Sequence, residues 1–226
     1  MQDNNAVFKL EKSMIKTAIY ILIFLTLIEF IAYFGFFRNI PNFFSKYGYY
    51  LIFLVIGIVI NSAAVWHIKA YKHYFSHMPG MMVGMTIGMT SGFTVGLVVG
   101  ATNGMFVGSL AGLIIGMSVG SYVGNCCGVM GIMEGMMAGL MGGLMGGMTA
   151  IMTLNDNLKI IMPILIVSIL TIIIGLLHMI YNEEIKHQSN INYKGFSLLP
   201  FVTVNFIITL ILTFLMIYGP RSFLFG

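Results

Sequence analysis

The stretch GMMVGMTIGMTSGFTVG, residues 80–96, places a glycine at every fourth position, and the period continues to Gly128. The register then slips by one residue and the period resumes from Gly131 to Gly147, with Gly142 and Gly146 in a second row. Four residues advance about 400° around a helix, so these glycines form one slowly winding groove. Such a groove lets backbones approach closely, as in the small-xxx-small packing of membrane helices. We therefore expect the helix-packing residues to be Gly80, Gly84, Gly88, Gly92, Gly96, Gly100, Gly104, Gly108, Gly112, Gly116, Gly120, Gly124, Gly128, Gly131, Gly135, Gly139, Gly143 and Gly147.

The composition indicates the class of protein. Of the 226 residues, 58% are hydrophobic and only 8% are charged. Water-soluble globular domains do not show this balance, so we expect an integral membrane protein. The net charge of +4 comes from basic residues between apolar runs, which is typical of positive-inside topology and contact with anionic lipid. It does not indicate nucleic acid as a partner.

Apolar runs predict the membrane spans. The runs 14–37, 49–71, 160–181 and 197–218 reach the roughly 20 residues that a spanning helix needs. The segment 78–152 would extend about 110 Å as one helix, so we expect three passes there. Polar residues place the turns near 101–103 and 125–127. The predicted fold is all-α with about seven transmembrane helices, or six if one pass is re-entrant. The third pass of the segment 78–152 carries small residues on two faces, so we expect it to lie in the centre of the bundle and to touch helices on both sides.

These spans divide the chain into three parts. We expect an N-terminal helix pair in residues 1–76, a central Gly/Met-rich unit of three helices packed as a glycine zipper in 77–153, and a C-terminal helix pair in 154–226. Basic residues are more frequent on the side of the N-terminus, which predicts that this terminus is cytoplasmic. The expected location is the cytoplasmic membrane of a bacterium.

Methionine is concentrated in the same central segment. On the third pass, every fourth residue is a methionine, two positions after each glycine and therefore about 200° away. Thioethers are soft, neutral ligands that suit Cu(I) and carry no buried charge. The alternative interpretation is that methionine is a flexible apolar filler beside glycine. The candidate thioether ligands are Met81, Met85, Met89, Met133, Met137, Met141 and Met145.

Other side chains near the methionines extend this hypothesis. His73 and His77 lie one helical turn apart just before the segment, and Cys126 and Cys127 form a vicinal thiol pair at the second turn. Both pairs are candidate entry or relay ligands for a soft metal ion. Glu134 is an acid within an apolar span and is the candidate charge partner of a bound cation.

The run MEGMMAGLMGGLMGGM, residues 133–148, together with HMPGMM at 77–82, resembles a group of uncharacterised Gly/Met-rich membrane proteins of Bacillus-like bacteria. The similarity covers residues 77–152. Some members of that group are associated with copper-binding cupredoxin domains, so the resemblance implies a copper-binding partner.

Two functions from different classes remain open at this point. The first is an integral membrane protein that binds or passes a soft metal ion, with Cu(I) as the expected cofactor, along a methionine-rich helical path. The second is a non-transporting structural or assembly protein whose glycine grooves dock helices of its own chain, of a homo-oligomer or of a partner in the bilayer. We expect no enzyme activity, because the chain has no P-loop or H-E-x-x-H motif.

Overall fold

The computed structural model describes residues 19–20, 22–23, 26–27, 47–70, 77–154, 156–180 and 198–220. This part of the chain is helical apart from short turns and contains no strand, which confirms the all-α prediction. The predicted first span, 14–37, lies almost entirely outside the described residues. The elements are α2 (Tyr49–Ala70), α3 (His77–Asn103), α4 (Met105–Gly124), the short turn η4 (Asn125–Cys127), α5 (Gly128–Met152), α6 (Leu158–Ile180) and α7 (Leu198–Tyr218).

Among the described residues, four helical stretches are long and apolar enough to cross a membrane. They are Tyr49–Ile68, Met78–Asn103, Met105–Met152 and Leu158–Ile180, and Thr203–Tyr218 is a shorter apolar helix. The third stretch doubles back on itself, because η4 separates the 20 residues of α4 from the 25 residues of α5. At about 1.5 Å per residue, each arm is about 30 Å or more, the thickness of the hydrocarbon core of a bilayer.

Glycine forms both turns of the central segment. Only Gly104 separates α3 from α4, with φ 103° and ψ 170°. Gly128 follows η4 with φ 73° and ψ −158°. Backbone in this region is accessible essentially only to glycine. The two turns therefore lie beside the polar residues that predicted them, at 101–103 and 125–127.

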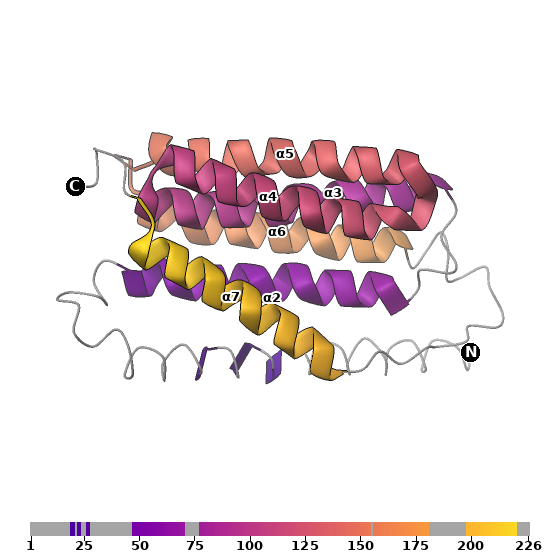
Figure 1. The fold of residues 1–226 in the computed structure, drawn as a ribbon, viewed down its shortest axis with the longest axis horizontal. Helices are drawn as coiled ribbons and strands as arrows, with labels where there is room; N and C mark the ends of the chain where they lie inside the picture. Colours follow the sequence, from indigo (N-terminus) through magenta and orange to yellow (C-terminus); the bar gives the residue numbers. More distant parts are fainter. Residues whose placement is uncertain are drawn as a thin grey trace.

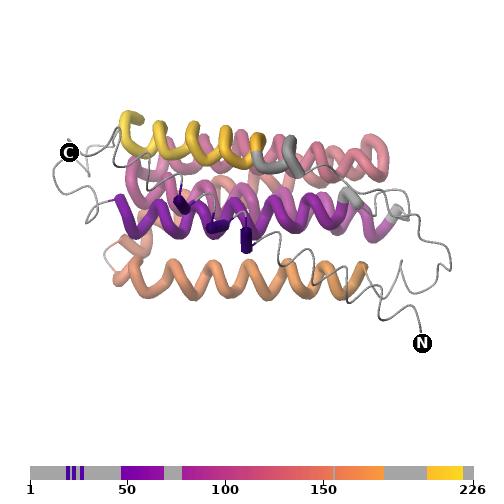
Figure 2. Tube along the Cα trace, turned by 90° about the horizontal axis from the view of Figure 1, so that it is seen from below, coloured from indigo at the N-terminus to yellow at the C-terminus, as the bar shows by residue number. Residues whose placement is uncertain are grey.

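The helices form two groups on opposite sides of α3. Helices α3, α4 and α5 lie side by side along the long axis of the molecule (Figure 1). Helices α2, α6 and α7 pack on the rest of α3, with α2 lying between α6 and α7 (Figure 2). We expected the third pass, α5, to be central and to touch helices on both sides. It does pack against both α3 and α4, but among the described helices it is α3 that contacts all the others. Both small faces of α5 are used within the three-helix group, which leaves α3 in the centre.

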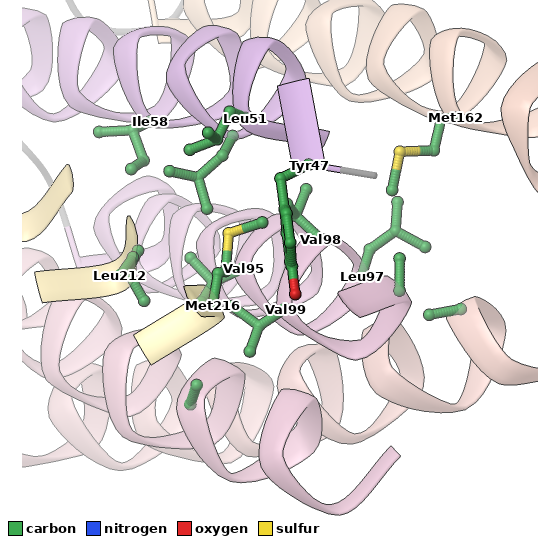
Figure 3. Close-up of a cluster of buried hydrophobic side chains, with 14 of the residues drawn as sticks. Tyr47, Leu51, Ile58, Val95, Leu97, Val98, Val99, Met162, Leu212 and Met216 are labelled. Atoms are coloured by element: carbon green, nitrogen blue, oxygen red, sulfur yellow. The ribbon is translucent and has the colours of Figure 1, made fainter. Parts of the chain in front are cut away.

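The side of α3 that lacks glycine forms an ordinary apolar core. Val95, Val98 and Val99 are buried against α2 and α7 in one cluster, with Met162 of α6 at its edge (Figure 3). Val83 and Ile87 are buried in a second cluster with residues of α2 and α6. Helix α3 is buried along most of its surface, and its exposed side chains include Met82, Met85 and Met89. The sequence of α3 thus combines a glycine row for α4 and α5 with a branched apolar face for α2, α6 and α7.

Candidate functional site

The glycines of α3, α4 and α5 meet in layers, with one glycine from each helix in a layer. A Cβ added to Gly84 would lie 2.9 Å from the Cα of Gly124, and one added to Gly88 would lie 2.6 Å from the carbonyl oxygen of Gly135. From one layer to the next, residue numbers rise in both α3 and α5 and fall in α4. Helices α3 and α5 are therefore parallel, and α4 is antiparallel to both. The layers are Gly84, Gly124 and Gly131; Gly88, Gly120 and Gly135; Gly92, Gly116 and Gly139; Gly96, Gly112 and Gly143; and Gly100, Gly108 and Gly147.

Backbone atoms fill the axis of this three-helix group. Cβ atoms added to Gly92 and Gly116 would each lie 2.7 Å from the carbonyl oxygen of Gly139. Real Cβ atoms essentially never approach backbone that closely, so no layer has room for a methyl group without movement of a helix. A conduction path along the glycines is therefore not formed by residues 77–154.

The methionine row of α5 lies on the opposite face. Gly131, Gly135, Gly139 and Gly143 are buried, whereas Met137 is 68% exposed. The other members of this row, Met133, Met141 and Met145, are also at least half exposed. Their thioethers are thus on the side of α5 opposite its glycine contacts with α4 and do not line an interior of the described chain.

The methionines of α3 border the contact between α3 and α5. A Cβ added to Gly142 would lie 2.9 Å from the Cα of Met89. The side chains of Met85 and Met89 are nevertheless exposed by more than two fifths, and Met81 is half-buried. On α5, each methionine of the row comes one residue before a member of the row that faces α3, for example Met141 before Gly142. Methionine rows from both helices therefore border the outer edge of the α3–α5 contact, which we call the outer seam.

Glu134 belongs to the row of α5 that faces α3. This row continues through Ala138, Gly142 and Gly146, and the last three are buried. Glu134 itself is half-buried, and it stands about 9 Å along the helix from Gly128. The carboxyl group is therefore near one end of the three-helix group and is separated by several turns from Met145.

The two cysteines occupy that same end. The thiols of Cys126 and Cys127 lie 3.4 Å apart, and Cys126 donates a hydrogen bond of 3.9 Å to the Gly80 carbonyl of α3. Cys127 is 6% exposed and Cys126 is half-buried. A Cβ at Gly80 would overlap the Cys127 sulfur, so glycine at this position makes room for the pair.

The structure brings together only part of the predicted ligand set. The two cysteines adjoin each other, and the methionine rows border one seam. His73 lies outside the described residues, and His77 is the first residue of α3. Within the described ranges, no three His, Cys, Asp or Glu side chains converge as a metal site.

A polar contact between α2 and α3 was not predicted. The Thr90 hydroxyl donates to the Asn61 side-chain oxygen at 2.8 Å, and the Asn61 amide donates to the Gly57 carbonyl at 2.9 Å and to the Thr94 hydroxyl at 3.4 Å. All three polar side chains are buried. A signal was present, because Asn61 is an amide within the apolar run 49–71 and such residues commonly bind across membrane helices.

No protein-family model, curated protein or solved structure matches this chain.

Proposed function

We propose that the chain is a multi-pass protein of the bacterial cytoplasmic membrane that binds a soft metal ion through methionine thioethers. Cu(I) is the ion that neutral sulfur ligands favour. One observation carries the proposal: Met133, Met137, Met141 and Met145 are all exposed on the face of α5 opposite its glycine contacts with α4. Methionine is a useful filler in the irregular gaps of a packed core, and these exposed positions are not such gaps.

The proposed membrane arrangement has about seven spans and a cytoplasmic N-terminus. The hairpin of α4 and α5 supports this number, because each arm is long enough to cross the hydrocarbon core. With α2, α3, α6 and α7, and with the predicted span 14–37, the total is seven. The tight backbone contacts of α3, α4 and α5 support a glycine zipper as the scaffold of this unit.

Any passage of the ion follows the outer seam between α3 and α5. Backbone fills the axis of the three-helix group, whereas Met85 and Met89 of α3 border the seam together with the methionine row of α5. Successive thioethers one helical turn apart offer equivalent neutral ligands along this line. Glu134, half-buried near one end, is the proposed charge partner, and His73, His77 and the cysteine pair are the proposed entry ligands. A copper-binding protein is the proposed partner.

Cu(I) binding by the purified, detergent-solubilised protein tests this function. The titration uses a competing Cu(I) chelator under reducing conditions. Substitution of the four row residues by leucine keeps their bulk, and we expect it to weaken Cu(I) binding by at least about tenfold, equivalent to about 1.4 kcal/mol. The matched control replaces three exposed methionines outside the row, Met105, Met148 and Met152, by leucine. Equal Cu(I) binding by the two variants would contradict the proposal.

A structural or assembly role is the second candidate function, and a different observation favours it. The glycines contact backbone of their own chain in every layer, so the repeat is fully accounted for by packing within α3, α4 and α5. Under this alternative, methionine serves as filler on the outer face. If the unsubstituted protein binds no more Cu(I) than the variant with leucine at the four row positions, this structural role is favoured.

A further inference from the structure

We infer that Cys126 and Cys127 form a separate dithiol site that binds a single soft, thiol-seeking ion at the end of the three-helix group. The class of ion rests on the proposed function, but the site does not require the methionine row. The first observation is the approach of the two sulfurs to 3.4 Å, so that both can reach one atom placed between them. A metal–sulfur bond is about 2.3 Å long, so binding requires only a modest separation of the thiols.

The turn geometry keeps this pair available as two thiols. Consecutive Cα atoms across a trans peptide are about 3.8 Å apart, whereas a disulfide usually needs about 4.4 Å or more. The described residues contain no cis peptide bond, and no disulfide joins the two cysteines. Neighbouring sulfurs that do not readily close into a disulfide are suited to chelation.

The surroundings hold the pair in place at the end of the three-helix group. Gly80 lies against both sulfurs, and its carbonyl accepts the Cys126 thiol hydrogen bond. Cys127 is buried beneath Cys126, while Asn125 and Gly128 on either side of the pair are exposed. Within the described residues, the site is therefore approached through the half-buried Cys126 at the end of the helices.

Occupancy of the site also joins two segments that are distant in sequence. The pair belongs to the turn between α4 and α5, and its contacts are with the first turn of α3. A ligand held by both sulfurs fixes this turn against α3. Because a ligand that binds only the folded state stabilises it, we expect binding to raise the unfolding temperature.

Phenylarsine oxide is the probe that requires two neighbouring thiols. Its arsenic forms two As–S bonds with the pair, and its oxygen leaves as water with the two thiol protons, so arsenic stays trivalent. We expect the full-length protein in detergent to bind one equivalent, to lose maleimide labelling of Cys126, and to unfold at a higher temperature. Cys127→Ser should abolish all three effects while maleimide still labels Cys126, and Cys126→Ser should abolish binding and the rise in unfolding temperature.

The variant with leucine at the four methionine positions separates this inference from the proposed function. We expect it to bind phenylarsine oxide as the unsubstituted protein does, whether or not it retains Cu(I) binding. The inference would be overturned by labelling of Cys126 at an unchanged rate in the presence of the probe, or by full protection of Cys126 in the Cys127→Ser variant. If leucine substitution leaves Cu(I) binding unchanged while phenylarsine oxide still binds, only the proposed methionine site is refuted.

Discussion

The Tyr49 hydroxyl of α2 donates a hydrogen bond to the Lys159 carbonyl of α6. In a regular helix this carbonyl would accept from the backbone N–H four residues later, but that residue is Pro163, which has no N–H. The tyrosine therefore satisfies a carbonyl that the helix leaves open, and it joins α2 to α6 where both helices begin.

Replacement of Tyr49 by phenylalanine should reveal this contact. We expect Tyr49→Phe to lower the free energy of unfolding by about 1 kcal/mol, because one interhelical hydrogen bond is lost with the ring kept. The measurement is SDS-induced unfolding followed by circular dichroism, with Tyr50→Phe as the neighbouring control. A larger loss in the control than in Tyr49→Phe would contradict the assignment.

Alanine at a glycine layer should separate packing from helix propensity. Gly139→Ala would direct its methyl group into the backbone of Gly116, so we expect a loss of stability of about 1–3 kcal/mol from overpacking. The matched control is Gly175→Ala in α6, where an added Cβ meets nothing within 4 Å. The control should change stability by less than about 1 kcal/mol, in the direction of greater helix propensity. Equal stability of the two variants would refute the layered arrangement.

Gly128 tests a conformational requirement rather than a steric one. An added Cβ there meets no atom within 4 Å, but φ is 73° and ψ is −158°. We expect Gly128→Ala to cost about 1–3 kcal/mol through backbone strain alone. Gly128→Asn should not rescue stability, since asparagine tolerates the left-handed helical region and not this extended one. Thermal unfolding of both variants gives the comparison, and full stability of either would show that the turn adopts another conformation.

The polar contact between α2 and α3 predicts a contribution of Asn61 to the stability of the folded protein. Asn61→Leu removes the bonds to Thr90 and Thr94 while keeping the number and branching of the side-chain heavy atoms. We expect a loss of about 1 kcal/mol, the usual range for a hydrogen bond between membrane helices. Ser62→Ala serves as the control, because the Ser62 hydroxyl bonds only to the Val59 carbonyl of its own helix among the described contacts. A neutral result for Asn61→Leu would mean that apolar packing alone holds α2 on α3.

Much of the fold was predictable because hydropathy and turn residues act locally. The ends of α3 and α4 follow from polar residues and glycines at 101–104 and 125–128. The register of the three helices was not predictable. A shift by four residues would again place glycine opposite glycine, so the repeat cannot choose among registers. The single residue between α3 and α4 restricts that choice, and this is a constraint of chain length.

The candidate site was less predictable than the fold. The sequence places Met133 and its row opposite the glycines of α5, and the structure has those side chains exposed. It could not indicate that α5 would lie at the edge of the described helices, because small residues on two faces are equally compatible with a central position. The contact of Gly80 with Cys127 was also hidden, since it joins residues 47 positions apart through the parallel register of the bundle.

The single-residue link at Gly104 has a consequence for biogenesis. During synthesis α3 is complete before any of its glycine partners exist, and its exposed backbone row must wait for α4. With only one residue between them, α4 must reverse direction immediately, so in the proposed membrane arrangement the two helices insert as a hairpin. Helix α5 then closes the last open side of that hairpin, which makes the vicinal thiol turn the final joint of the central unit to be set.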